Sequence, residues 1–144
     1  LVRMFIDSMM MSVLDKMGEN IAIQGELMGP GIQGNREGFK TNKFFIFDVQ
    51  DLENGVYYTP EMRMSLLDDL YGYGVDPDMV MHVPIRATNV RLVDLGIGNV
   101  QQLLACAESP SINHPVSEGD VYKRMDGKFS FKAISNKFLE KEKD

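Results

Sequence analysis

The sequence is short of cysteine, of long apolar runs and of positive charge, and each shortage excludes a class of protein. The single cysteine, Cys106, excludes an intramolecular disulfide and a metal cluster held by cysteines alone, which favours a reducing, intracellular and cytoplasmic setting. No apolar run approaches the roughly 18 residues of a membrane span, and no signal-peptide pattern opens the chain, so we expect no membrane partner. The formal net charge of −6 argues against a free-standing nucleic-acid clamp.

The chain otherwise has an ordinary size and composition. Its 144 residues and 16.3 kDa fit one domain. The apolar share of 44% and the charged share of 25% are close to globular averages. The first residue is Leu1 and not methionine, so we expect a fragment of a longer protein.

Apolar spacing and capping residues predict three helices. They cover residues 2–17, a segment that starts at Thr59-Pro60, and a segment that runs from Asn99 to Ala107. Gly18 is placed to end the first helix, and Met62, Leu66 and Leu70 would be the buried stripe of the second. Gln102 completes a capping box with the residue that starts the third.

Alternating and aromatic segments predict five strands between turns. They cover residues 21–27, 44–49, 80–86, 119–123 and 128–134. Pro84 interrupts the third of them, and Asp126-Gly127 favours a tight hairpin between the last two. Strand pairs at both ends with helices between them predict a mixed α+β fold.

Two polar residues precede a glycine-rich loop in the first half. Gln24 and Glu26 share one face of the strand 21–27, and the loop 29–35 follows. Such a face usually meets solvent, but beside a rigid turn Glu26 could also accept hydrogen bonds from ribose hydroxyls. The loop is not a P-loop, because no Gly-Lys-Ser/Thr follows, and a tight connection between strands is its expected role.

Two further segments carry candidate binding groups. Alternation places Phe45 and Phe47 on one strand face and Asp48 on the other, as core or as a stacking platform for a base. Glu118 and Lys132, from neighbouring strands, offer a carboxylate for a divalent cation and an ammonium for a phosphate. Alone, the same two residues would be a surface ion pair.

The order of these segments resembles motifs III, IIIa, IV and V of the covalent nucleotidyltransferases, the superfamily of ATP-dependent polynucleotide ligases and capping enzymes. The segments read Ile23-Gln24-Gly25-Glu26-Leu27, Phe44-Phe45-Ile46-Phe47-Asp48-Val49, Glu118-Gly119-Asp120-Val121-Tyr122-Lys123 and Ser130-Phe131-Lys132-Ala133-Ile134-Ser135-Asn136-Lys137-Phe138-Leu139. With the glycine-rich loop, they look like the ATP-dependent RNA ligases that seal 3′-OH and 5′-phosphate ends in RNA repair. The resemblance spans residues 20–139.

The resemblance implies a fold, ligands and residue roles. It implies a partial nucleotidyltransferase (ATP-grasp-like ligase) domain over residues 1–144, with antiparallel sheets and flanking helices. The implied ligands are ATP or AMP, Mg²⁺ or Mn²⁺, and RNA ends or a nicked RNA-containing duplex. Gln24 and Glu26 would bind the nucleotide, with Glu26 on the ribose, while Phe47 would stack on adenine. Glu118 would engage the metal and Lys132 the phosphates, both as catalytic residues.

The sequence departs from the family pattern at three places. The motif Lys-x-Asp/His-Gly, whose lysine carries AMP, does not occur in it, so we expect the half of the domain that holds this motif to be missing. Asp120 stands where the family usually has an apolar residue, and by alternation it shares the face of Glu118, where it would join the metal site or form an unpaired acidic cluster. Ile134 stands where many relatives have a second phosphate-binding lysine, for which Lys137 or a residue beyond this chain could substitute.

These departures leave two further hypotheses beside the RNA ligase fragment. The chain could be a non-catalytic module that binds a nucleotide or an RNA end, or a relative of DNA ligases or capping enzymes. Without the nucleophile motif, we expect no lysyl-AMP adduct on this chain alone.

Overall fold

The structure, a computed structural model, describes residues 2–142 and divides into two compact units, Leu1–Pro84 and Ile85–Asp144. The elements of the first unit are α1 (Val2–Asp7), α2 (Met10–Met17), β1 (Ile21–Met28), the 3₁₀ turn η1 (Gln33–Asn35), β2 (Lys43–Asp51), β3 (Val56–Tyr57), α3 (Pro60–Gly72) and β4 (Val80–His82). The elements of the second are η2 (Leu92–Leu95), α4 (Val100–Ala107), β5 (Gly119–Lys123), β6 (Ser130–Ile134) and α5 (Asn136–Glu142). The α+β class is confirmed. Among the described residues, no helix is long and apolar enough to cross a membrane.

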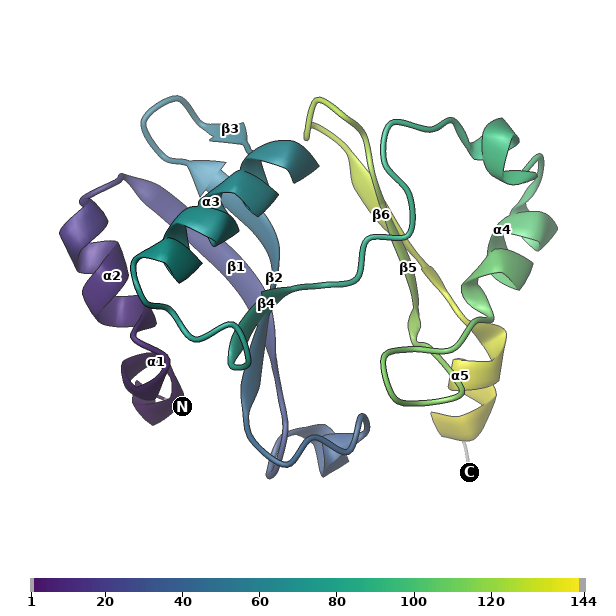
Figure 1. The fold of residues 1–144 in the computed structure, drawn as a ribbon. Helices are drawn as coiled ribbons and strands as arrows, with labels where there is room; N and C mark the ends of the chain where they lie inside the picture. Colours follow the sequence, from purple (N-terminus) through teal and green to yellow (C-terminus); the bar gives the residue numbers. More distant parts are fainter. Residues whose placement is uncertain (1, 143–144) are drawn as a thin grey trace. The chain divides into compact units, whose positions relative to one another are not determined.

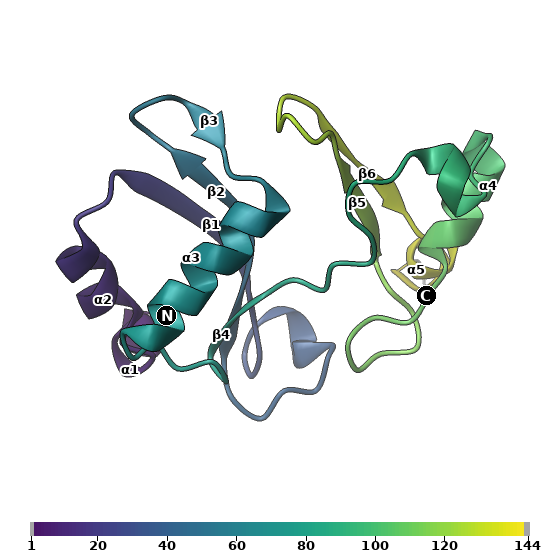
Figure 2. The same ribbon diagram turned by 45° about the horizontal axis from the view of Figure 1, so that its top comes forward.

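The first unit is a four-stranded sheet with its helices on one face (Figure 1). Strand β2 is central: it pairs antiparallel with β1 and β3, and parallel with β4. The parallel pair is an addition to the antiparallel sheets that we expected. Turning the molecule shows α1, α2 and α3 on the same side of the strands (Figure 2).

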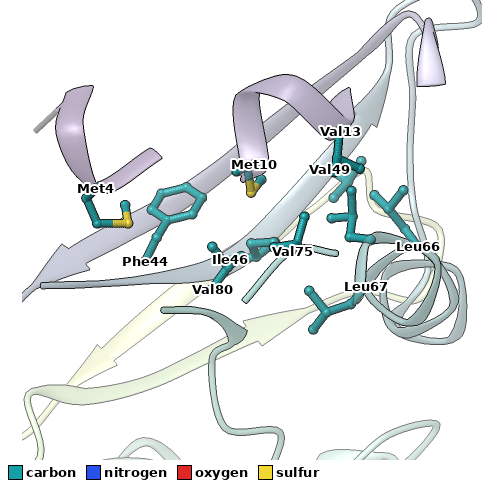
Figure 3. Packing of buried hydrophobic residues seen from close by; sticks show 11 residues of the cluster. Met4, Met10, Val13, Phe44, Ile46, Val49, Leu66, Leu67, Val75 and Val80 are labelled. Atoms are coloured by element: carbon teal, nitrogen blue, oxygen red, sulfur yellow. The ribbon is translucent and has the colours of Figure 1, made fainter. Parts of the chain in front are cut away.

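The hydrophobic core lies between this sheet and its helices. Met10 and Val13 of α2, and Leu66 of α3, pack in one cluster with Ile46 and Val49 of β2 (Figure 3). Strand alternation puts Ile21 and Ile23 of β1 on this face, because every second residue of a strand points the same way. In β2, a bulge between Ile46 and Val49 brings these two residues to the same face although they are three positions apart. The opposite face of the sheet is therefore left for Gln24 and Glu26.

The predicted helix over residues 2–17 is broken into α1 and α2. Ser8 is fully buried, and its carbonyl accepts the N–H of Asp76 at 3.0 Å instead of a helical partner. Met9 then takes a left-handed conformation, with φ 67°, which a helix interior does not allow. The predicted end at Gly18 is confirmed, since its N–H donates to the Leu14 carbonyl.

Helix α3 starts where predicted, and Leu66 and Leu70 of the predicted stripe are buried, but Met62 is not. The Thr59 hydroxyl accepts the N–H of Met62 at 3.2 Å, as an N-cap does. Met62, however, is 48% exposed, and Arg63 is buried in its place. Arg63 donates from Nε to Nε2 of His82 at 2.9 Å and from Nη1 to the Tyr58 carbonyl at 3.0 Å, and burial lowers the pKa of its guanidinium.

The second unit is a two-stranded hairpin, β5–β6, with α4 and α5 beside it. The hairpin turn falls at Asp126-Gly127 as predicted, and the side chain of Asn99 caps α4 by accepting the N–H of Gln102 at 2.8 Å. The predicted strand 80–86 is shorter, because pairing with β2 ends at His82. Arg86 therefore lies in an irregular segment of the second unit.

Candidate nucleotide and metal site

Glu118 and Lys132 are brought together in the second unit. The Nζ atom of Lys132 lies 3.2 Å from Oε2 of Glu118, and the two side chains are 43% and 39% exposed. Strands β5 and β6 pair in a register that sets Lys132 opposite Val121. A carboxylate and an ammonium that share a partly exposed surface could bind a cation and a phosphate respectively.

Gly119 brings Glu118 to this surface. If the alternation of β5 continued to the residue before Gly119, Glu118 would lie on the same face as Asp120. Lys132 lies on the other face of the hairpin, with Val121. Gly119 has φ 151°, and a Cβ there would lie 2.0 Å from the Ala133 carbonyl oxygen. Only glycine fits this position, and the irregular backbone lets Glu118 contact Lys132.

Asp120 does not form the acidic cluster that alternation predicted. Its carboxylate, 13% exposed, accepts from Nη1 of Arg86 at 2.5 Å. The same pairing raises the pKa of the Arg86 guanidinium. Both alternatives that we considered for Asp120 assumed that it shared a partner or a face with Glu118, whereas the two carboxylates pair with different cations.

Arg86 was missed by the sequence analysis. An acid at a position where relatives have an apolar residue is a signal that a cation must lie nearby, but the sequence holds 15 lysines and arginines and gives no means of choosing among them. The pairing joins residues 34 positions apart. Beside it, burial raises the pKa of Tyr122 to about 12.

Lys137 and Ile134 lie in different surroundings. The Nζ atom of Lys137 lies 3.6 Å from Oε2 of Glu108, which follows α4. Ile134 is 41% exposed and follows Lys132 by two positions in β6, on the same face. On this face, the residue next to Lys132 is therefore apolar, at the position where the resemblance to the ligases predicted a second lysine.

In the first unit, Gln24 and Glu26 are exposed on one face of β1. Their partners across the ladder are Asp48 and Phe45. Gly25, between them, lies so close to β2 that a Cβ would be 2.5 Å from the ring of Phe44. The two polar side chains are therefore carried on a strand that is packed tightly against its neighbour.

Phe47 is the extra residue of a β-bulge. The register passes from Gln24 opposite Asp48 to Gly25 opposite Ile46 and so skips Phe47. The predicted faces are wrong for this reason: Phe45 and Asp48 lie on the face of Gln24 and Glu26, because the bulge resets the alternation. Phe47 itself is half-buried.

Phe45 belongs to the protein interior and not to a stacking platform. It is 2% exposed, and its ring lies 5.7 Å from that of Phe39. Asn35, the last residue of the glycine-rich loop, accepts the N–H of Phe39 at 3.0 Å and donates to the carbonyl of Phe39 at 2.8 Å. The loop connects β1 with β2, the structural role that we expected for it.

A metal at Glu118 would depend on few protein ligands. The described residues contain no group of three or more His, Cys, Asp or Glu side chains that could hold an ion. One carboxylate nevertheless suits Mg²⁺, which is commonly bound by one or two carboxylates together with water and substrate phosphates. The residues present fit such an ion.

Comparison with known families identifies the chain. The RNA ligase family model matches residues 4–134. The chain belongs to the RNA ligase family. A comparison with curated protein sequences gives no match.

Solved structures of this family are similar over almost the whole chain. Three are variants of the Naegleria gruberi RNA ligase, one with AMP and Mn, one with ATP and Mn, and one in the apo form. Their identities to the chain are 43%, 41% and 41%, with TM-scores of 0.84, 0.83 and 0.83. The match covers 99%, 99% and 98% of this chain but 40% of each of those chains. The nucleotidyltransferase ligase fold is confirmed, and the chain spans about 40% of the length of these RNA ligases.

Proposed function

We propose that the chain is the nucleotide- and metal-binding part of an ATP-dependent RNA ligase, which joins RNA 3′-OH and 5′-phosphate ends through adenylylated intermediates. On this proposal, residues 1–144 are a partial nucleotidyltransferase domain that lacks the half with the Lys-x-Asp/His-Gly motif. The observation that carries it is the 3.2 Å contact between Lys132 and Glu118 in a chain of the RNA ligase family.

The spacing of these two residues supports the assignment. Glu118 and Lys132 are 14 positions apart. The solved variants of the Naegleria gruberi RNA ligase include one with a glutamate and one with a lysine replaced by alanine, and those two positions are also fourteen apart. The glutamate variant was solved with AMP and Mn, and the lysine variant with ATP and Mn.

In the second unit, we assign Lys132 to the nucleotide phosphates and Glu118 to the divalent cation. A lysine ammonium stabilises the charge that spreads over a phosphoryl group during transfer. Mg²⁺ or Mn²⁺, when bound, would offset the same charge. Without ligands, the ammonium and the carboxylate neutralise each other across 3.2 Å, and ligand binding would replace this contact.

In the first unit, we assign Gln24 and Glu26 to the nucleoside and Phe47 to the adenine ring. The exposure of Gln24 and Glu26 leaves their polar atoms accessible, and a carboxylate can accept from both hydroxyls of a ribose. A ring at a bulge is aimed differently from its neighbours in the strand. Base–aromatic stacking contributes about 1–3 kcal/mol, so Phe47 would account for much of the base affinity.

Labelled ATP tests whether this chain lacks the lysine that becomes adenylylated. Incubated with ATP and Mg²⁺, this chain should give no labelled band on a denaturing gel, because it has no nucleophile motif. A labelled band at 16.3 kDa would contradict the fragment assignment.

Sealing of nicked RNA duplexes tests the residue roles in a protein that also carries the Lys-x-Asp/His-Gly segment. Glu118→Ala and Lys132→Ala should each abolish sealing with an unchanged circular dichroism melt, whereas Lys128→Ala, at an exposed lysine near the hairpin turn, should seal normally. Normal sealing by Lys132→Ala would remove the phosphate role. Binding of ATP without sealing of RNA or DNA nicks by the unaltered protein would favour a non-catalytic binding module.

A further inference from the structure

We propose that Arg86 is a positioning residue for Glu118, because it fixes the chain on both sides of that carboxylate. Its importance for activity rests on the proposed function of Glu118, but its effect on the position of Glu118 does not. A set of hydrogen bonds within the second unit connects Arg86 to the segments on both sides of Glu118.

Arg86 contacts two different segments of the second unit through one nitrogen. Its Nη1 atom donates to Oδ2 of Asp120 at 2.5 Å and to Oγ of Ser109 at 3.2 Å. The carbonyl of Cys106, at the end of α4, is a third acceptor at 3.3 Å. The guanidinium therefore joins β5 to the loop that follows α4.

This loop controls the residue before Glu118. The N–H of Ser117 donates to the carbonyl of Ser109 at 2.8 Å, and Ser117 is 9% exposed. The hydroxyl of Ser117 accepts the N–H of Gly119 at 3.0 Å. The backbone on the N-terminal side of Glu118 is thus tied to Ser109, a partner of Arg86.

The other side of Glu118 is held through Asp120. Asp120 follows Glu118 by two residues, and its side chain is 13% exposed because it faces Arg86. Gly119 lies between them and has φ 151°. A backbone in such an uncommon conformation persists only where the surrounding contacts hold it. Arg86 thus contacts Ser109 and Asp120, the anchors of the two ends of the segment that turns Glu118 toward Lys132.

The pair with Arg86 also gives Asp120 a different partner from that of Glu118. Paired with the guanidinium, Asp120 does not compete with Glu118 for a cation or for Lys132. Groups that hydrogen-bond directly to a metal-binding side chain typically change metal affinity by about 10- to 100-fold when they are removed. Arg86 acts on Glu118 through Asp120 and Ser109, so we expect an effect at the lower end of this range.

Amide hydrogen exchange of the 144-residue chain tests the positioning without any ligand. The relevant amides are Gly119, which donates to Ser117, and Ser135, which donates to the carbonyl of Glu118 at 2.9 Å. In Arg86→Met, both should exchange about tenfold faster or more, as expected for the loss of a hydrogen bond to a charged group. The amide of Arg124, which donates to the Phe129 carbonyl near the hairpin turn, should be unchanged.

Three further variants make the test specific. Arg86→Lys keeps the charge but not the planar donor group and should restore part of the protection. Asp120→Asn should loosen the same amides, and the double variant Arg86→Met/Asp120→Asn should add little to the larger single effect. The matched control Arg91→Met removes an exposed guanidinium–carboxylate pair of the same unit and should change neither amide.

Mn²⁺ alone then probes the consequence for the site. In the unaltered chain, Mn²⁺ should broaden the amide signals of Glu118 and Lys132, and Arg86→Met should weaken this binding by about tenfold. Wild-type protection in Arg86→Met, equal loosening at Arg124, or additive effects of the two substitutions would each overturn the positioning role. Absence of Mn²⁺ broadening in the unaltered chain would instead count against the proposed function, and the exchange result would still decide the role of Arg86.

Discussion

The two units differ in what holds them together. In Leu1–Pro84, eleven buried side chains from α1, α2, α3, the sheet and Val75 form one hydrophobic cluster. In Ile85–Asp144, the buried apolar side chains among the described residues are Ile97, Ala107 and Ala133. The second unit relies instead on the ladder of its hairpin and on the hydrogen bonds of Arg86, Ser109 and Ser117.

This difference separates stability from the candidate catalytic residues. Burial of apolar surface contributes about 25 cal/mol per Å², so the first unit has a large and non-directional source of stability. Hydrogen bonds contribute less, but they fix directions. Glu118 and Lys132 lie in the unit where directional contacts dominate, which suits residues that must be aimed at a ligand.

The largest effect should come from the core of the first unit. Leu70 is 0% exposed, and Leu70→Ala should lower the free energy of unfolding by about 2–5 kcal/mol through lost burial and a cavity. Leu95→Ala, at a leucine of the second unit that is 42% exposed, should change it by about 0.5 kcal/mol at most. Urea titration, followed by the NMR amide signals of each unit, measures both changes. Equal losses would show that the second unit depends on its apolar side chains as much as the first unit does.

A backbone substitution should give the next largest effect, confined to the second unit. Gly119→Ala forces a Cβ toward the Ala133 carbonyl at an unsuitable φ and should destabilise the hairpin by about 1–3 kcal/mol. Gly72→Ala is the matched control, because nothing lies within 4 Å of a Cβ at that position of α3. The same urea titration should show the loss in signals of β5 and β6, and a native hairpin in Gly119→Ala would contradict the role of this glycine.

Removal of the site ion pair should have a small effect on stability and a large one on binding. Glu118→Gln should change the free energy of unfolding by about 0.2–1 kcal/mol, as for other partly exposed pairs, yet abolish Mn²⁺ broadening of the Lys132 signal. Lys137→Met, which removes the pair with Glu108, should leave that broadening intact. Mn²⁺ binding by Glu118→Gln with wild-type affinity would show that the second unit is not specialised as we infer.

The smallest effect concerns the hairpin turn and its dependence on pH. Hydrogen bonds from Arg124 lower the pKa of Asp126 from 3.8 to about 2, and a carbon-detected NMR titration should find its midpoint there. A lowered pKa contributes stability that is present above pH 3.8 and is lost as the pH falls toward 2. Arg124→Ala should raise the midpoint toward 3.8, and an unchanged midpoint would exclude the ion pair in solution.

Local signals in the sequence predicted the ends of elements well. The caps at Thr59 and Asn99, the stop at Gly18 and the turn at Asp126-Gly127 are all confirmed. Each depends on contacts between residues no more than about four positions apart, which the sequence contains in full.

Predictions that needed distant partners were less successful. The helix over residues 2–17 is broken where the Ser8 carbonyl accepts the N–H of Asp76. In α3, Met62 is exposed and Arg63 is buried instead, where it donates to His82. The sequence could not reveal either contact, because the residues involved meet only after the sheet and helices have packed.

The candidate site shows both kinds of outcome. The likeness to RNA ligases selected Glu118 and Lys132, and the hairpin brings them into contact. Their approach, however, depends on the backbone of Gly119, and the strand faces around Phe47 depend on a bulge that alternation alone does not contain.

The sequence by itself determined the family, the α+β class and the helix caps, and it selected the residues of the candidate site, because these follow from motifs and from short-range hydrogen bonds. Only the tertiary structure decided which face each site residue occupies and that Arg86, and not another cation, pairs with Asp120. Those outcomes depend on strand register and on packing between segments that lie tens of residues apart, where a shift of one position moves a side chain to the opposite face.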